Sequence, residues 1–229
     1  MEKIIEISGV RKVYRVGNEK VVALDNIDLT VEKGEFCCLL GTSGSGKSTL
    51  LNLMAGLEKP TRGQIRIKNE YMEKLDEKKL AVFRQNNIGF VFQSYNLLPA
   101  LTALENVSLP LAFKGIPRSI RDKRAKAMLE AVGLTSQLKR KPSQMSGGQQ
   151  QRVGIARAFV GKPEIVFADE PTGNLDSKTT REVMELITAM ARKHNQTLII
   201  VTHDITIAAY ADKVIHIQDG NIEKVEMKQ

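Results

Sequence analysis

The spacing of apolar residues predicts strands along much of the chain. Ile5-Glu6-Ile7 shows the two-residue alternation of a strand with one buried face, whereas residues 36–40 are apolar throughout, as in a strand buried on both faces. Turns with glycine or proline separate such segments, as at Lys33-Gly34 and at residues 59–63. Strands are expected at residues 5–7, 10–14, 21–31, 36–40, 64–68, 88–92, 165–168, 198–201, 213–217 and 221–225.

Helical patterns appear between these strands, and after residue 148 helices and buried strands alternate. Such alternation predicts a parallel sheet flanked by helices. Residues 96–145 read as helical, contain four prolines and lack a continuous buried strand, and Thr102 and Glu105 have capping-box spacing. We therefore expect an α/β domain with an inserted helical lobe. Helices are expected at residues 47–56, 76–84, 118–131, 149–160 and 177–193.

Composition is that of an ordinary globular protein. Of the 229 residues, 42% are apolar and 26% are charged, which excludes a disordered chain, a collagen-like chain and a coiled-coil rod. The net charge of +8 would suit nucleic acid, an anionic membrane face or a highly charged anionic ligand. Adjacent Cys37 and Cys38 cannot form a disulfide framework, so a reducing compartment is expected. With no signal-type segment and no apolar run of about 20 residues, any membrane role would need a partner chain.

One glycine-rich segment has the pattern of a phosphate-binding loop (P-loop). The pattern G-x-x-x-x-G-K-[ST] is met by Gly41, Thr42, Ser43, Gly44, Ser45, Gly46, Lys47 and Ser48. Glycines let backbone N–H groups form an anion nest, and the following helix directs its positive end at the same anion. Lys47 would reach the β- and γ-phosphates, and Ser48 would ligate Mg²⁺. The preceding strand and following helix favour this interpretation over a glycine-rich turn with a solvated lysine.

Two carboxylates end a later buried strand. Asp169 and Glu170 follow the apolar residues 165–168, and ligands of open α/β sheets bind at that end of the strands. Asp169 would hold Mg²⁺, and Glu170 would polarise the water that attacks the γ-phosphate. An Asp-Glu pair can also be a solvated strand end, but the phosphate-binding loop favours the catalytic interpretation.

A second helix start is suited to an anion. Ser146 and Gln149 have capping-box spacing, and Gly147 and Gly148 permit close backbone approach. Without the phosphate-binding loop, an ordinary capped helix would explain the same pattern. One nucleotide does not need two such helix ends from one subunit. Two subunits arranged head-to-tail would need them, because each end would close the partner's P-loop.

These motifs, in this order, resemble those of the ATP-binding-cassette (ABC) ATPases over essentially the whole chain. The most specific is Ser146-Gly147-Gly148-Gln149, which is similar to the family's signature. The resemblance implies a single domain, 1–229, with a P-loop NTPase core, a mostly parallel sheet, an N-terminal antiparallel β subdomain and an inserted α-helical subdomain. The core and β subdomain would comprise residues 1–95 and 146–229, and the helical subdomain about 96–145.

The resemblance also assigns roles to residues outside these motifs. Tyr14 would stack on adenine, Gln93 would touch Mg²⁺ and report the γ-phosphate to the helical lobe, and His203 would orient the water. In isolation, Tyr14 and His203 would be interpreted as structural strand-end residues. Asp176 would lie in a loop that crosses to the partner subunit. The implied catalytic residues are Glu170, His203, Lys47 and Gln93, and the implied metal ligands are Ser48, Gln93 and Asp169. To the P-loop, the implied nucleotide site adds the signature residues together with Tyr14, Thr49, Gln93, Asp176 and His203.

Two positions depart from the family pattern. Met145 stands where leucine is usual, and the similar volumes predict little consequence. Asn174 stands where many relatives have alanine, a form common in the branch of lipoprotein-releasing, macrolide-export, cell-division and peptide-antibiotic-resistance cassettes. The stretches 88–99 and 168–177 also resemble that branch.

We therefore expect an ATP-hydrolysing subunit of an ABC transporter, with ATP and Mg²⁺ bound. Two copies would close around two ATP molecules and drive a separate integral membrane permease from the cytoplasmic face of the cell membrane, for export or lipoprotein extraction. The alternative, a soluble ABC ATPase acting on nucleic acid or ribosomes, is disfavoured by the dispersed basic residues and the single cassette. A small-molecule kinase would have no use for the signature.

Overall fold

The computed structural model describes residues 2–228. These residues form two compact units: those up to Arg84 together with those from Thr197 onward, and Gln85–Gln196. Both units contain strands and helices. The subdomain boundaries expected near residues 95 and 146 stay a prediction, because the compact units divide at other positions.

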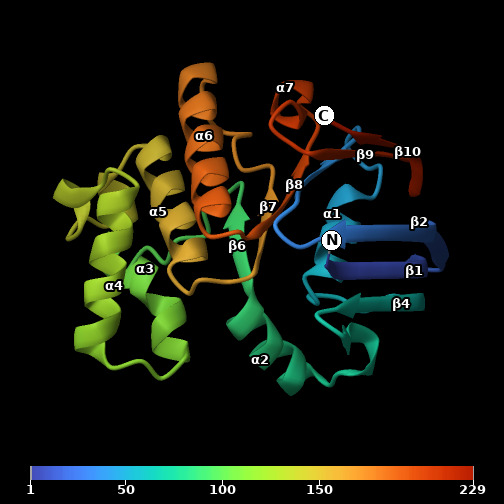
Figure 1. The fold of residues 1–229 in the computed structure, drawn as a ribbon, viewed down its shortest axis with the longest axis horizontal. Coiled ribbons are helices and arrows are strands. Elements are labelled where there is room, and N and C mark those ends of the chain that lie inside the picture. Colours follow the sequence, from blue (N-terminus) through green and yellow to red (C-terminus); the bar gives the residue numbers. More distant parts are fainter. Residues whose placement is uncertain (1, 229) are drawn as a thin grey trace. The chain divides into compact units, whose positions relative to one another are not determined.

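The first unit contains an antiparallel sheet with the strand order β2-β1-β4-β5. Its strands are β1 (Lys3–Val16), β2 (Glu19–Glu32), β4 (Arg62–Ile67) and β5 (Glu70–Tyr71), and Figure 1 shows β1, β2 and β4 side by side. The prediction of two separate strands in residues 5–14 was wrong. β1 is continuous because irregularities in its pairing, one of them between Ile7 and Val10, absorb extra residues without ending the strand.

The same unit holds parallel strands, of which β3 leads into the phosphate-binding loop. β3 (Phe36–Leu40) pairs in parallel with β8 (Thr197–Thr202) and with β9 (Lys213–Gln218), and β10 (Asn221–Met227) pairs antiparallel with β9. Every residue of β3 is buried, as its apolar sequence predicts. The helical elements of this unit are α1 (Lys47–Met54), η1 (Met72–Lys74) and α7 (Ile205–Ala208), and α2 (Glu77–Asn87) begins in it and ends in the second unit.

The second unit combines a parallel strand pair with helices. β6 (Ile88–Phe92) pairs in parallel with β7 (Ile165–Asp169). The helical elements are α3 (Ala103–Phe113), α4 (Arg118–Ala131), η2 (Thr135–Gln137), η3 (Pro142–Gln144), α5 (Gly147–Phe159) and α6 (Ser177–Lys193). Their core includes Val107, Leu129 and Val153, one each from α3, α4 and α5, and all three are fully buried. Met145 also joins this core, as a side chain of leucine-like volume can.

The fold class is confirmed, and the remaining differences are local. α5 begins at Gly147, two residues before the predicted start, because Ser146 caps the helix and both glycines adopt helical geometry. β5 and α7 were not predicted, because elements of two and four residues are too short to show a periodic pattern of apolar residues. The predicted capping box of Thr102 and Glu105 is confirmed at the start of α3. Among the described residues, no helix has both the length and the apolarity to cross a bilayer.

Candidate functional site

The phosphate-binding loop runs from the end of β3 into α1. Gly46 is the N-cap of α1 with φ of 102°, which lies in the left-handed region. A Cβ at this position would lie 2.6 Å from the carbonyl oxygen of Ala23, so only glycine fits. The cap provides no side-chain hydrogen bond and the first turn of α1 holds no acidic residue. The positive end of α1 is therefore suited to an external anion.

Two further side chains of the loop fit a phosphate group. Lys47 is buried, and its Nζ donates a hydrogen bond to the carbonyl oxygen of Thr42 at 2.6 Å, which folds the ammonium group back over the loop. The hydroxyl of Ser45 is buried without a hydrogen-bond partner in the described part of the chain. Buried polar groups normally have such a partner, and a phosphate oxygen would supply it.

Tyr14 lies beside α1 in a polar cluster. Its hydroxyl donates to Oε2 of Glu58 at 2.7 Å and also bonds with the side chain of Thr49. Lys12 Nζ lies 2.8 Å from the same Glu58 oxygen and 4.9 Å from the centre of the Tyr14 ring. Burial is the main cause that raises the pKa of the Tyr14 hydroxyl, and the hydrogen bond to Glu58 raises it further. The cluster thus fixes the ring next to the helix that begins at the P-loop.

β8 brings His203 to the same edge of the strands as the P-loop. Leu40 of β3 and Thr202 of β8 are partners in parallel register, so Gly41 and His203 each come directly after a paired residue. The His203 side chain is exposed, and Asp204 caps the short helix α7 that follows. Within the first unit, the structure therefore brings together the P-loop and His203 at one strand edge and Tyr14 beside α1.

In the second unit, β6 and β7 bring Gln93 and the two carboxylates to a common edge. Phe92 and Asp169 are partners in parallel register, so Gln93 and Glu170 each follow directly. Asp169 and Glu170 are half-buried, whereas Gln93 is exposed. The φ of Glu170 is 44°, a left-handed conformation that non-glycine residues seldom adopt and that is often found at functional sites.

The loop after Glu170 packs against Gln93. A Cβ on Gly173 would lie 2.7 Å from Gln93 Nε2, so the glycine lets the Gln93 side chain lie directly against this loop. The Asn174 side chain donates to the carbonyl oxygen of Gln93 at 3.2 Å. An alanine at position 174 could not make this bond, so the asparagine side chain ties the loop to the backbone of Gln93.

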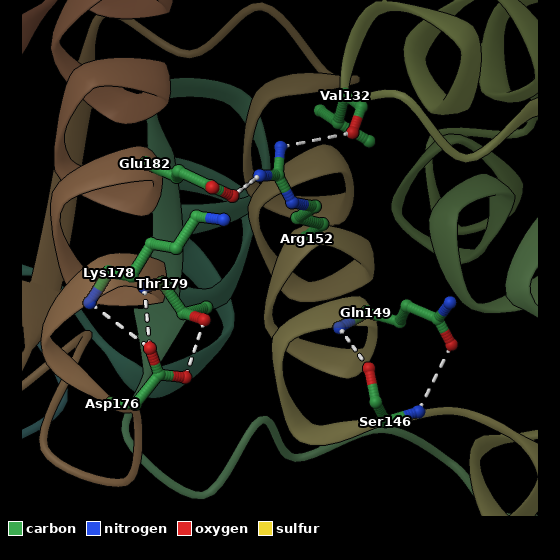
Figure 2. A network of polar contacts seen from close by, with 8 residues as sticks. All are labelled: Val132, Ser146, Gln149, Arg152, Asp176, Lys178, Thr179 and Glu182. Carbon is green, nitrogen blue, oxygen red and sulfur yellow. Dashed lines mark hydrogen bonds and ion pairs between the residues drawn. The ribbon is translucent and has the colours of Figure 1, made fainter.

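Figure 2 shows the capped starts of α5 and α6. Ser146 Oγ accepts from the Gln149 backbone N–H at 3.3 Å, and the Gln149 side chain accepts from the Ser146 N–H at 3.0 Å, which confirms the predicted capping box. Asp176 Oδ1 accepts two backbone N–H groups of α6, and its Oδ2 accepts from the Thr179 hydroxyl at 2.6 Å. Two hydrogen bonds from Thr179 lower the pKa of the Asp176 carboxyl, and the bond from the Thr179 hydroxyl has a larger effect than the bond from its backbone N–H. A Cβ on Gly148 would lie 3.0 Å from the Thr179 methyl group, so the two starts are close neighbours.

Two residues of α5 bond to the loops that follow Gln93 and Glu170, and the sequence analysis did not identify them. Gln151 is fully buried, and its side chain donates to the carbonyl oxygen of Pro171, directly after Glu170. The Arg157 guanidinium donates to the carbonyl oxygens of Tyr95, at 2.8 Å, and Asn96, in the loop after Gln93. Burial lowers the pKa of Arg157. The only sequence signal is their place on the helix that begins at the signature, because many surface positions also carry glutamine or arginine.

The chemistry of the donors suits Mg²⁺ held with a phosphate. Among residues 2–228, no group of three or more histidine, cysteine, aspartate or glutamate side chains could hold a metal ion. Ser48, Gln93 and Asp169 offer hydroxyl, amide and carboxylate oxygens, which Mg²⁺ accepts alongside phosphate oxygens and water. The donor chemistry of each of these residues therefore suits Mg²⁺ that would arrive with its nucleotide.

Comparison with known proteins gives consistent results. The profile of the family described as "ABC transporter" matches residues 24–173. An uncharacterized ABC transporter ATP-binding protein of Thermotoga maritima is 46% identical over 228 residues, which cover 100% of this chain and 97% of the relative. The lipoprotein-releasing system ATP-binding protein LolD of Geobacter metallireducens is 46% identical, with coverage of 97% and 99%. The macrolide export ATP-binding/permease protein MacB of Hahella chejuensis is 45% identical, over 96% of this chain and 34% of MacB.

A solved structure matches at the level of the fold and the sequence. The dimeric post-hydrolysis state of the ATP-binding cassette MJ0796, bound to ADP and Pi, superposes with a TM-score of 0.92. The two chains are 43% identical, and the match covers 99% of each. The family profile, the relatives matched over nearly their full length and the shared fold agree: this chain belongs to the ABC transporter family, as an ATP-binding and ATP-hydrolysing subunit.

Proposed function

We propose that the chain transfers the γ-phosphoryl group of ATP to water and couples this reaction to a separate membrane permease. The start of α1 supports this activity most directly. Gly46 provides no side-chain cap, Lys47 is folded over the loop and the buried Ser45 hydroxyl has no partner. Such a transfer depends on positioning and charge neutralisation, with no covalent enzyme intermediate.

The first unit would bind the nucleotide. The backbone of residues 41–48 would wrap the β- and γ-phosphates, and Lys47 would neutralise their charge. Tyr14, held next to Thr49, would stack on the adenine ring. His203 would contact the γ-phosphate, since it follows the strand that is paired in register with the strand before the loop.

The second unit would activate the water. Glu170 would accept a hydrogen bond from the attacking water and act as the base for its proton. As the water oxygen bonds to the γ-phosphorus, the bond from that phosphorus to the bridging oxygen breaks, and ADP leaves with that oxygen. The contact between Gln93 and the loop from Gly173 to Asp176 would make the glutamine sensitive to the γ-phosphate. Mg²⁺, when bound to Ser48, Gln93 and Asp169, would neutralise charge on the transferring phosphoryl group.

We further propose that two copies act head-to-tail around two ATP molecules. The similar cassette MJ0796 has been solved as a dimer bound to ADP and Pi. The capped start of α5, with Ser146, Gly147, Gly148 and Gln149, would close the P-loop of the partner subunit. Asp176 would contribute to the contact with the partner subunit through the shape of its loop, because both of its carboxylate oxygens already accept hydrogen bonds from the first turn of α6.

The proposed site of action is the cytoplasmic face of the cell membrane, against an integral permease. The relatives LolD and MacB are named for lipoprotein release and macrolide export. We therefore propose export, or extraction of a lipoprotein or lipid, as the driven process. Expression of the chain together with a candidate permease from the same genome, followed by affinity purification, tests this assignment. A stable complex in which the permease changes the ATPase rate of the chain supports the assignment. A permease that neither binds the chain nor changes its ATPase rate contradicts it.

Substitution Glu170→Gln tests the proposed reaction. We expect unchanged affinity for ATP and phosphate release slower by about 10²–10⁴-fold, because the amide cannot act as a base for the water. Fluorescent-nucleotide binding and phosphate release would be measured on the same preparation. Glu185→Gln, at an exposed position of α6, removes the same charge and should keep the wild-type rate. Wild-type hydrolysis by Glu170→Gln would remove Glu170 from the mechanism.

A further inference from the structure

A basic hollow of about 380 Å³ lies on the antiparallel sheet of the first unit, and none of the roles above uses it. This volume falls within the range of small-molecule sites, about 300–1,000 Å³. Its lining comes from β1, β2, β4 and the residue before β4, and it contains no acidic side chain. We name it the basic hollow; it is lined by Arg11, Val13, Arg15, Lys20, Val22, Thr61 and Arg62.

The strand register places like charges opposite one another in this hollow. Arg15 of β1 is the direct partner of Lys20 on β2, and Arg11 of β1 is the partner of Arg62 on β4. Cross-strand pairs of like charge destabilise a sheet, and neighbouring strands usually place opposite charges there. Two such pairs around one hollow are a local conflict of the kind that marks functional sites.

Little in the described chain neutralises these charges. The Asp25 carboxylate lies 3.3 Å from Arg11 Nε, which leaves Arg15, Lys20 and Arg62 without an ion pair among residues 2–228. The Thr61 hydroxyl accepts the Val13 backbone N–H at 3.0 Å and can donate its own proton to a ligand. Three exposed cations without an ion pair in the described chain, and one hydroxyl, therefore line the same space, where a polyanion would relieve their repulsion.

We propose that the basic hollow binds a phosphate-bearing anion, either a free diphosphate-type group or the head group of an anionic lipid. Guanidinium groups match phosphate oxygens in a bidentate geometry, and the hollow has room for such a group. The site is distinct from the P-loop. Lys12 and Tyr14, which alternate with the lining residues of β1, contact Glu58 instead.

The double variant Lys20→Gln/Arg62→Gln removes one cation from each like-charged pair. Calorimetry with pyrophosphate on the full chain, saturated with ADP to fill the P-loop, should give binding to the wild type and at least tenfold weaker binding to the variant. In phosphate-free buffer of low ionic strength, the variant should have a higher Tm than the wild type, because repulsion is relieved. Lys78→Gln, an exposed lysine of α2, should change neither result.

Flotation with vesicles distinguishes the two sources of the phosphate group. Binding to phosphatidylglycerol vesicles but not to phosphatidylcholine vesicles, lost in the double variant, identifies a lipid head group; a pyrophosphate response without vesicle binding identifies a free anion. Unchanged basal ATP hydrolysis by the variant shows that its fold is intact. The proposal is overturned if the wild type binds neither probe, if the variant binds them equally well, or if only duplex DNA binding depends on these residues.

Discussion

At the scale of residues, one carboxylate connects the predicted adenine-stacking ring to the helix of the P-loop. Glu58 accepts hydrogen bonds from Tyr14 at 2.7 Å and from the Asn52 side chain at 3.3 Å, and it pairs with Lys12 at 2.8 Å. Asn52 belongs to α1, so the orientation of the ring and the position of the helix depend on the same group. We infer that Glu58 is a positioning residue for the nucleotide base.

Glu58→Ala should therefore weaken ATP binding more than triphosphate binding. A hydrogen bond to a charged group contributes about 1.5–3 kcal/mol of free energy. Without the bond from Glu58, Tyr14 would be less well oriented, and part of this free energy would be lost from the binding of ATP. We expect a KM for ATP about 3–30-fold higher, little change in kcat, and unchanged affinity for inorganic tripolyphosphate, which has no base. Glu58→Gln keeps an acceptor for the Tyr14 hydroxyl and should restore most of the affinity. Equal losses for ATP and tripolyphosphate would contradict the positioning role.

The lowered pKa of Asp176 leads to a prediction about pH. Because the folded state lowers this pKa, the charged form stabilises the fold at pH values above the ordinary aspartate pKa of about 3.9, and the stabilisation is lost as pH falls through the folded-state pKa. The wild type should therefore be more stable than Asp176→Ala at pH 7, and the gap should shrink below about pH 4. Urea unfolding of both proteins from pH 2.5 to 7 measures this. A gap that is the same at every pH would contradict the assigned role of the carboxylate.

At the scale of elements, two helices begin with the same capping box but should differ in function. Ser146 caps α5 and Thr102 caps α3, and each is completed by a side chain three residues later. Ser146→Ala and Thr102→Ala should each cost about 0.5–2 kcal/mol of stability. Only Ser146→Ala should also slow ATP hydrolysis at protein concentrations that allow dimers. Denaturant unfolding and phosphate release measure the two effects, and equal ATPase losses in both variants would mean that Ser146 is only a cap.

The elements also show how far the sequence predicts the structure. The apolar run 36–40, the glycine loop and the box of Ser146 and Gln149 were predictable, because each signal lies within a few neighbouring residues. The contacts of Gln151 and Arg157 were not, since their partners lie 20 and about 60 residues away in sequence. The basic hollow could not be predicted for the same reason, because it depends on a strand register that places Arg11 opposite Arg62. Along the sequence, these basic residues are only dispersed charges.

At the scale of the whole molecule, the proposed functional residues divide between two compact units. The P-loop, Tyr14 and His203 belong to the first unit, whereas Gln93, Glu170 and the signature belong to the second. The first unit has an uncapped helix start at Gly46, and the second has the capped start at Ser146 that we propose to close the P-loop of a partner chain. A head-to-tail pair of chains gives both helix starts a nucleotide to bind, and dimerisation driven by ATP is therefore the central claim.

The most direct test is the oligomeric state of Glu170→Gln, measured by size-exclusion chromatography with light scattering. With ATP and Mg²⁺, this variant should elute as a dimer of the 25.4 kDa chain, and with ADP or without nucleotide it should elute as a monomer. The double variant Ser146→Ala/Glu170→Gln should shift less toward the dimer at the same concentration of ATP. If Glu170→Gln binds ATP and still remains a monomer, the account of two chains closing around shared nucleotides is contradicted.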